Sequence, residues 1–156
     1  MRFLPHRTKG PGVSARPQKE KKMIVNLTPH DVAIYNISDC ILNYGMLYLR
    51  EKEDMEYPEP LRVYPAAKDP ARMHFVQRDP GTADGILVYR WASYGITGLP
   101  EPKPDTYYIV SKILAQACPE REDLICPGTT VYDADDNVVG CIDFPECRGR
   151  HGREVL

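Results

Sequence analysis

Long hydrophobic runs are missing from this chain of 156 residues. No apolar stretch approaches the roughly 20 residues that a membrane-spanning helix requires. Residues 1–22 also lack the apolar core of roughly 7 to 15 residues that marks a secretion signal. From these two absences we predict a cytoplasmic protein with no membrane partner.

Close-spaced cysteine pairs are also absent, and the cysteines are odd in number. A zinc site usually needs ligands in close pairs, and a secreted disulfide framework needs an even count. We therefore predict reduced thiols, no metal site and no cofactor. Cys118 and Cys141 fall in apolar patterns, which is typical of small core residues. The five cysteines are Cys40, Cys118, Cys126, Cys141 and Cys147.

The common catalytic signatures are missing too. The chain contains no P-loop, no dinucleotide-binding fingerprint and no HExxH sequence. The acidic stretch 133–137 superficially resembles a calcium loop, but the central glycine and terminal glutamate of an EF-hand do not follow in register. The turn of a β-hairpin explains this stretch better.

Positive charge is scarce outside the first 22 residues. Seven Lys or Arg and one Glu give residues 1–22 a charge of +6, and since the whole chain carries −2, residues 23–156 carry −8. An acidic body attracts phosphate backbones poorly, so we do not expect a nucleic-acid partner. Residues 1–22 hold three prolines and two glycines. We interpret them as a flexible basic leader and Met23 as the natural start of the domain.

The most informative stretch runs from Thr106 to Arg121. Its aromatic and β-branched residues 107–110 predict a strand. From Ser111 the apolar residues recur one helical turn apart, which predicts a short helix that Pro119 ends. A strand, a polar corner and a helix therefore follow one another here.

Other apolar runs predict short strands separated by loops and turns. The loops are expected at residues 36–44 and 51–60, and a tight turn at residues 78–81. The predicted strands are residues 23–27, 32–35, 46–50, 61–64, 73–77, 86–91, 124–126, 129–132 and 138–142.

These elements predict an α+β fold, with mostly antiparallel short strands and one main helix at about residues 111–118. Residues 23–144 are expected to form a single domain. Residues 1–22 are the leader, and residues 145–156 form a loose polar tail.

The polar corner at the start of the helix is the first candidate site. A helix N-terminus presents unpaired backbone N–H groups and attracts anions, so Ser111 and Lys112 are candidate phosphate ligands. Arg121 is a candidate bidentate clamp on a phosphate or carboxylate. The alternative is that Ser111 is an ordinary helix cap.

His30 is the second candidate, because it lies in a tight turn beside polar neighbours. A Ser111 nucleophile with His30 as base is a further hypothesis, although residues 109–113 lack the GxSxG setting. The alternative for His30 is a structural role in its turn. The complete predicted ligand-binding set is Asn26, Thr28, His30, Ser111, Lys112, Arg121 and Asp123.

Two short sequences resemble a family of small bacterial and phage proteins. Residues 26–30 read Asn-Leu-Thr-Pro-His, and residues 108–111 read Tyr-Ile-Val-Ser. In that family the second sequence is followed by a short helix, an Arg-x-Asp pattern, a glycine and a cysteine. The corresponding residues here are Arg121, Asp123, Gly140 and Cys141. The resemblance covers residues 23–144 and implies a phage or bacterial context without an activity.

Three functions remain open from the sequence. The first is a binding protein for a small anionic, nucleotide-derived ligand, which in a phage would sequester a host immune signal as an anti-defence protein. The second is a metal-independent phosphodiesterase or hydrolase of such a signal, using His30 with Ser111 or Asp123. The third is a protein-interaction module without a small ligand, with exposed tyrosines as the contact surface. A homo-oligomer is also an open alternative.

Overall fold

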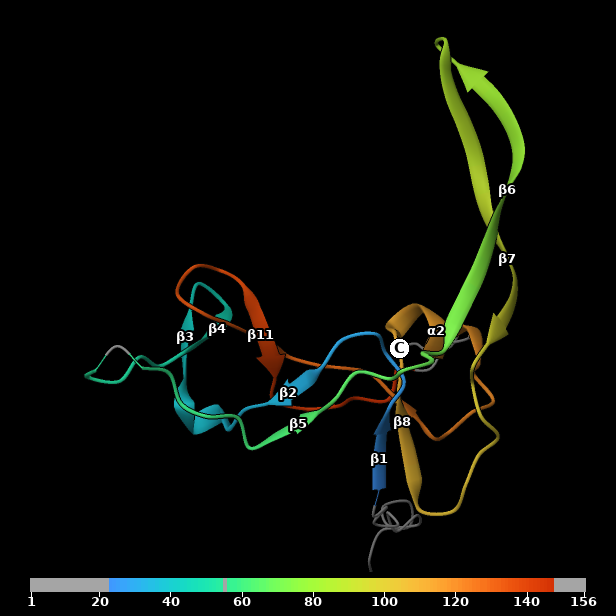
Figure 1. Cartoon of the computed structure of the whole chain (residues 1–156). Helices are drawn as coiled ribbons and strands as arrows, with labels where there is room; N and C mark the ends of the chain where they lie inside the picture. The colour runs from blue at the N-terminus through green and yellow to red at the C-terminus, as the bar shows by residue number, and fades with distance from the viewer. Residues whose placement is uncertain (1–22, 55, 148–156) are drawn as a thin grey trace, which may run out of the picture.

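The computed structural model describes residues 23–54 and 56–147 (Figure 1). The predicted leader, residues 1–22, and most of the predicted tail, residues 148–156, lie outside the described residues. The described chain consists mostly of strands, with one short α-helix, and its strands form three sheets.

The elements of the described chain follow one another in this order: β1 (Met23–Asn26), β2 (Val32–Ile34), the 3-10 helix η1 (Ile37–Asp39), β3 (Cys40–Asn43), β4 (Met46–Leu49), β5 (Arg62–Tyr64), β6 (Arg72–Ala83), β7 (Ile86–Thr97), β8 (Thr106–Ile109), α2 (Lys112–Ala117), β9 (Leu124–Ile125), β10 (Thr130–Tyr132) and β11 (Val138–Cys141).

Strand β8 lies at the centre of a three-stranded parallel sheet, in the order β1-β8-β9. After Thr106 its residues are apolar or aromatic on both faces, as expected for a parallel strand covered on both sides. Ile109 is 0% exposed. The Tyr108 N–H donates to the Asp123 carbonyl at 2.8 Å, and the Val110 N–H donates to the Ile125 carbonyl at 2.9 Å. The predicted strand at 107–110 is therefore the core of this sheet.

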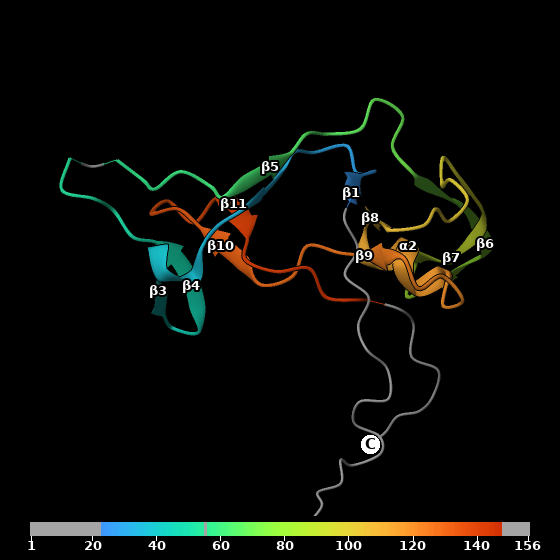
Figure 2. The ribbon, with the colours of Figure 1, turned by 90° about the horizontal axis from the view of Figure 1, so that it is seen from below.

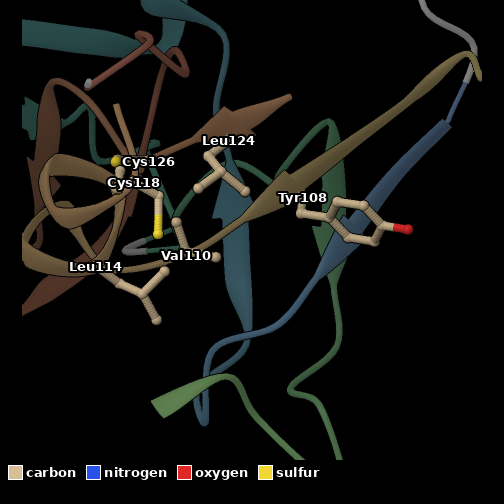
Figure 3. Close-up of a cluster of buried hydrophobic side chains, with 7 residues drawn as sticks. Tyr108, Val110, Leu114, Cys118, Leu124 and Cys126 are labelled. Carbon is tan, nitrogen blue, oxygen red and sulfur yellow. The ribbon is translucent and has the colours of Figure 1, made fainter. Parts of the chain in front are cut away.

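Helix α2 forms where the sequence predicts a helix, and it packs against this sheet. Ser111 has extended dihedrals, and its Oγ accepts a hydrogen bond from the Leu114 N–H at 3.2 Å, which caps the helix. Figure 3 shows side chains from the strand end and the helix gathered in one cluster. The buried members of the cluster are Tyr108, Val110, Leu114, Ala115, Cys118, Leu124 and Cys126.

A six-stranded mixed sheet extends to one side of the parallel sheet, in the order β3-β4-β10-β11-β2-β5 (Figure 2). Its hairpins are antiparallel, but β10 pairs with β4 and β11 with β2 in parallel. Tyr35, Cys40, Leu49 and Val131 form its buried cluster. The prediction of mostly antiparallel strands therefore holds for the hairpins and for β2 with β5, whereas β4 with β10, β2 with β11 and both pairs of the three-stranded sheet are parallel.

Strands β6 and β7 form a two-stranded antiparallel sheet of their own, which projects from the rest of the molecule (Figure 1). Asp84 and Gly85 connect the strands with φ values of 55° and 77°. Two consecutive positive φ values are typical of the type I′ turn that matches the twist of a hairpin. Each strand is 12 residues long.

The structure corrects two predictions about local structure. The expected loop at 36–44 contains η1 and β3, since Cys40 is buried and pairs with Leu49. The expected turn at 78–81 is an irregularity inside β6, where the register shifts between Arg78 and Gly81 and Asp79 has φ 52°. Bulges contain the same residue types as turns, so local chemistry alone did not separate the two.

Candidate functional site

Asn26 organises the turn that leads to His30. Its Nδ2 donates to the carbonyls of His30 at 2.8 Å and Tyr64 at 2.9 Å. Its Oδ1 accepts from the Thr28 N–H at 2.9 Å and from the Thr28 hydroxyl at 2.7 Å. A carboxamide has two donors and two acceptor sites, so these four bonds use them all. Asn26 and Thr28, which we predicted as ligand-binding residues, are therefore used to hold the turn.

His30 lies at the exposed end of this turn and lines a hollow of about 460 Å³. Asp31 lines the same hollow, and its Oδ1 accepts a hydrogen bond from the Ala66 N–H at 2.8 Å. Thr130 and Gly140 come to this hollow from strands β10 and β11. The volume lies within the range of small-molecule sites. Of the predicted residues, His30 is thus the one that faces this space.

Ser111 lies in a different place. Its hydroxyl oxygen caps α2, and its other surroundings form a hollow of about 390 Å³ lined by Arg72, His74 and Ile113 among others. Helix α2 has only six residues, so its dipole is short and an anion site at its start has little support. Lys112 is exposed. The structure therefore supports the cap interpretation of Ser111 that the sequence left open.

Arg121 and Asp123 form a buried ion pair. The Arg121 Nε and Nη2 donate to the two carboxylate oxygens of Asp123 at 2.8 and 2.7 Å, and Nη2 also donates to the Pro100 carbonyl at 3.0 Å. Their side chains are 14% and 6% exposed. The hydrogen bond with Asp123 raises the pKa of the Arg121 guanidinium. The predicted anion clamp is instead engaged with a carboxylate of its own chain.

The predicted site residues are thus divided among three structural features. His30 and Ser111 line different hollows, so the hypothesis that they act together as base and nucleophile gains no support. Asn26, Thr28 and His30 do form one bonded group, because they are neighbours in sequence. Arg121 and Asp123 form another, at the end of the loop that follows α2.

A surface that the sequence did not single out lies on the projecting hairpin. Paired residues of an antiparallel sheet share a face and alternate along each strand. Since Phe75 pairs with Ser93 and Gln77 with Trp91, Phe75 and Trp91 share a face, together with Tyr89 and Leu87. The Phe75 and Trp91 rings lie 6.5 Å apart, and those of Tyr89 and Trp91 lie 5.3 Å apart, both edge-on.

This face continues onto helix α2. Phe75, Trp91 and Ile113 line an apolar hollow of about 380 Å³ where the hairpin meets the helix. Their exposed fractions are 43%, 61% and 60%, and Leu87 nearer the hairpin tip is 57% exposed. We call the five side chains the aromatic strip. Its members are Phe75, Leu87, Tyr89, Trp91 and Ile113.

The opposite face of the hairpin differs in chemistry. Arg78 and Arg90 are paired across the strands and lie on that face, where Arg90 forms an exposed ion pair with Asp79. The hairpin thus has one uncharged aromatic face and one face that carries arginines. The large apolar side chains at every second position, Leu87, Tyr89 and Trp91, are the sequence signal for this arrangement. The sequence does not say, however, whether a third strand covers the aromatic face.

No protein-family model, curated protein or solved structure matches this chain. The resemblance to small bacterial and phage proteins therefore stays a prediction. In residues 23–54 and 56–147, no helix is long and apolar enough to cross a membrane, and no group of three or more His, Cys, Asp or Glu residues is arranged to hold a metal ion. The candidate sites are therefore the hollow beside His30, the hollow beside Ser111 and the aromatic strip with its own apolar hollow.

Proposed function

We propose that this protein is an interaction module that binds another polypeptide through the aromatic strip of the β6–β7 hairpin. One observation supports this proposal most strongly. A long hairpin projects from the body, and on one of its faces the side chains of Leu87 and Trp91 are more than half exposed.

Physical chemistry favours a partner for such a hairpin. An isolated two-stranded sheet is marginally stable in water, and it normally needs a third strand or a packed face. Contiguous exposed apolar surface is also uncommon on proteins that act alone. Tyr and Trp are frequent anchors of protein interfaces, and the hollow between Phe75, Trp91 and Ile113 has the apolar lining that accepts an anchor residue.

Site-specific photo-crosslinking tests this proposal for a polypeptide partner of any sequence. A photoreactive amino acid replaces Tyr89 on the strip, and in a matched control it replaces Arg90, which points to the other face. We expect polypeptide adducts from position 89 and few from position 90 when the protein is made at its natural level. Equal labelling from both positions, or no adducts from position 89, would contradict the proposal.

A second candidate function is the binding of a small ligand in the hollow beside His30. Its volume of about 460 Å³ and the nearness of His30 to Asp31 favour it. From the sequence we predicted an anionic, nucleotide-derived ligand, bound or hydrolysed, at a site shared by His30 and the Ser111 corner, and we now propose the hollow beside His30 for it.

Thermal-shift measurements with a panel of nucleotide-derived compounds test this second candidate. We expect a stabilising compound whose effect His30→Ala abolishes and His74→Ala leaves unchanged, since His74 lines the other hollow. Mass analysis of the compound after heat release separates binding from hydrolysis. An effect that persists in His30→Ala would remove His30 from the site.

A further inference from the structure

We infer that the polypeptide bound by the aromatic strip is a second copy of this chain, in a two-fold dimer whose hairpins pack face to face and antiparallel. The inference rests on the proposed function and names its partner. Four features of the hairpin support it.

The first feature is the size of the strip. At the exposed fractions given above, Phe75, Leu87, Trp91 and Ile113, together with the partly buried Tyr89, offer on the order of 500 Å² of apolar surface. A standard interface buries about 800 Å² per partner, a little more than half of it apolar. Gln77, Thr82 and Ser93 share the face and supply a polar remainder. One hairpin face thus matches one side of a standard dimer interface.

The second feature is that the aromatic strip must be shielded from water at all times. The strip consists of large apolar side chains on a ribbon to which no other strand of the described residues pairs, so the cover is required whenever the chain is folded. A second copy of the chain is the one partner that is always present at the same concentration as the hairpin itself. An isologous contact also needs no second complementary surface, because each strip covers the other.

The third feature is the absence of charge on the strip. Lysines, arginines and acids are missing from the paired positions that share its face between Met73 and Leu87, whereas Arg78 and Arg90 lie on the opposite face. Two copies can therefore pack strip against strip without burying an unpaired charge, which would be costly. The acidic body, with −8 over residues 23–156, opposes association only at long range, where salt screens it.

The fourth feature is the spacing of the strip residues. Leu87, Tyr89 and Trp91 follow at intervals of two residues along β7, so they stand on one face at equal steps. A two-fold axis through Tyr89 places Leu87 of one copy against the partner subunit's Trp91. There Leu87 meets the hollow that Phe75, Trp91 and Ile113 line. An exposed apolar knob and an apolar hollow are thereby matched twice in each dimer.

Leu87→Lys and Val88→Lys provide a matched pair of variants. The two residues are adjacent, apolar and 57% and 51% exposed, but they face opposite sides of the hairpin. In sedimentation of the purified full chain over a wide concentration range, we expect a dimer for the wild type and for Val88→Lys. Leu87→Lys should raise the dimer dissociation constant by at least about tenfold, because its ammonium group would be buried in the interface.

Cysteine cross-linking tests the position of the two-fold axis. In a Cys147→Ser background, which removes the one cysteine that is not buried, a short bismaleimide should link Tyr89→Cys chains into dimers, since packed sheets lie about 10 Å apart, too far for a direct disulfide. It should not link Arg90→Cys chains, whose cysteine lies on the other face. Circular dichroism confirms that all variants are folded. The fluorescence of Trp91, the single tryptophan of the chain, should shift to shorter wavelength as the dimer forms.

The two proposals fail in different ways. A wild-type chain that sediments as a monomer at all concentrations, or a Val88→Lys variant that is as defective as Leu87→Lys, overturns the dimer. If photo-adducts of position 89 with other proteins persist in that case, the interaction module stands with a different partner. If no polypeptide adducts form at position 89 either, both proposals are wrong.

Discussion

At the scale of the residue, buried polar groups hold the turns and loops of this protein in place. Asn26 uses both donors and both acceptor sites of its carboxamide within the chain, and Arg121 bridges Asp123 and the Pro100 carbonyl. Such groups are costly to bury unless they are bonded. Their removal is therefore expected to affect stability more than binding.

Arg121→Ala should lower the free energy of unfolding by about 3 kcal/mol, because breaking a buried ion pair leaves a buried charge without that partner. Arg90→Ala is the matched control, since the Arg90 and Asp79 side chains are 77% and 67% exposed. Exposed pairs contribute at most about 1 kcal/mol. Urea unfolding of both variants measures the difference. Equal losses would show that burial does not set the strength of these pairs.

Cys126 should make the protein sensitive to alkali. Burial, with a smaller contribution from the hydrogen bond to Cys147, raises the pKa of the Cys126 thiol from 9.0 to about 12. A raised folded pKa stabilises the fold fully below the unfolded pKa, and this contribution is lost as the pH rises. The free energy of unfolding should therefore fall between pH 9 and pH 12.

Denaturant unfolding at several pH values measures this decline. Cys126→Ala should flatten it, and Cys147→Ala should flatten it less, because burial of Cys126 persists. Some decline should remain in both variants, since burial also raises the pKa of the Cys141 and Cys118 thiols. A Cys126→Ala protein with the unchanged alkaline decline would assign the effect to other groups.

At the scale of the element, close backbone approach fixes the middle of the six-stranded sheet. A Cβ atom on Gly140 in β11 would lie 2.4 Å from the Ala33 carbonyl oxygen and 2.9 Å from a ring carbon of Tyr35. Both distances are shorter than van der Waals contact, and the backbone of a packed strand cannot easily move aside. Only glycine fits this position without a shift of the neighbouring strand.

Gly140→Ala should therefore cost about 1 to 3 kcal/mol, the usual effect of forcing extra volume into packed structure. Gly81→Ala in the β6 irregularity is the control, because no atom of the described residues lies within 4 Å of the added Cβ. Thermal unfolding should show a clear loss for the first variant and little change for the second. A similar melting temperature for Gly140→Ala and wild type would show that β11 can move away from β2.

The same scale shows what the sequence could predict. The strand at β8, the cap at Ser111 and the helix that follows are encoded by adjacent residues, so their local pattern was sufficient. The parallel pairs of β8 with β1 and β9 join distant segments, and no local pattern specifies them. Strand β3 was not predicted because polar neighbours interrupt its apolar residues. The full length of β6 was not predicted because the bulge within it contains residue types that are typical of a turn.

The same difference between local and distant contacts explains which parts of the candidate site could be predicted. Asn26, Thr28 and His30 form one bonded group because the first and the last are only four positions apart in the sequence. His30 and Ser111 were expected to share a cavity, but only the tertiary fold decides which strand ends meet. The aromatic strip was hidden for a related reason, since a strand pattern does not reveal whether its apolar face is covered.

At the scale of the whole molecule, the parallel sheet and the projecting hairpin should differ in local stability. The amides of Tyr108 and Val110 are bonded inside a sheet buried on both sides, whereas the hairpin has exposed residues along most of its length. Backbone opening requires little energy where few apolar contacts are lost.

Hydrogen exchange measured by NMR should therefore find slow exchange at Tyr108 and Val110 and fast exchange at the hairpin tip in dilute protein. Raising the protein concentration should slow exchange between Leu87 and Trp91 if dimers form. Leu114→Ala should speed exchange at Val110 without affecting the tip, since Leu114 packs in the cluster of the parallel sheet. Hairpin amides as slow as Val110 in dilute protein would contradict this difference.

The pairing of β1 with β8 has a consequence for protein synthesis. Met23 pairs with Thr106, so 83 residues of chain must follow the first strand before its partner exists. The hairpin between them consists of contiguous residues, so its strands can pair without waiting for a distant segment. The aromatic strip residues of the hairpin are therefore synthesised and exposed before the parallel sheet can form. If the chain dimerises through the aromatic strip as we infer, two chains that are translated from one messenger RNA could pair through their hairpins before either is complete.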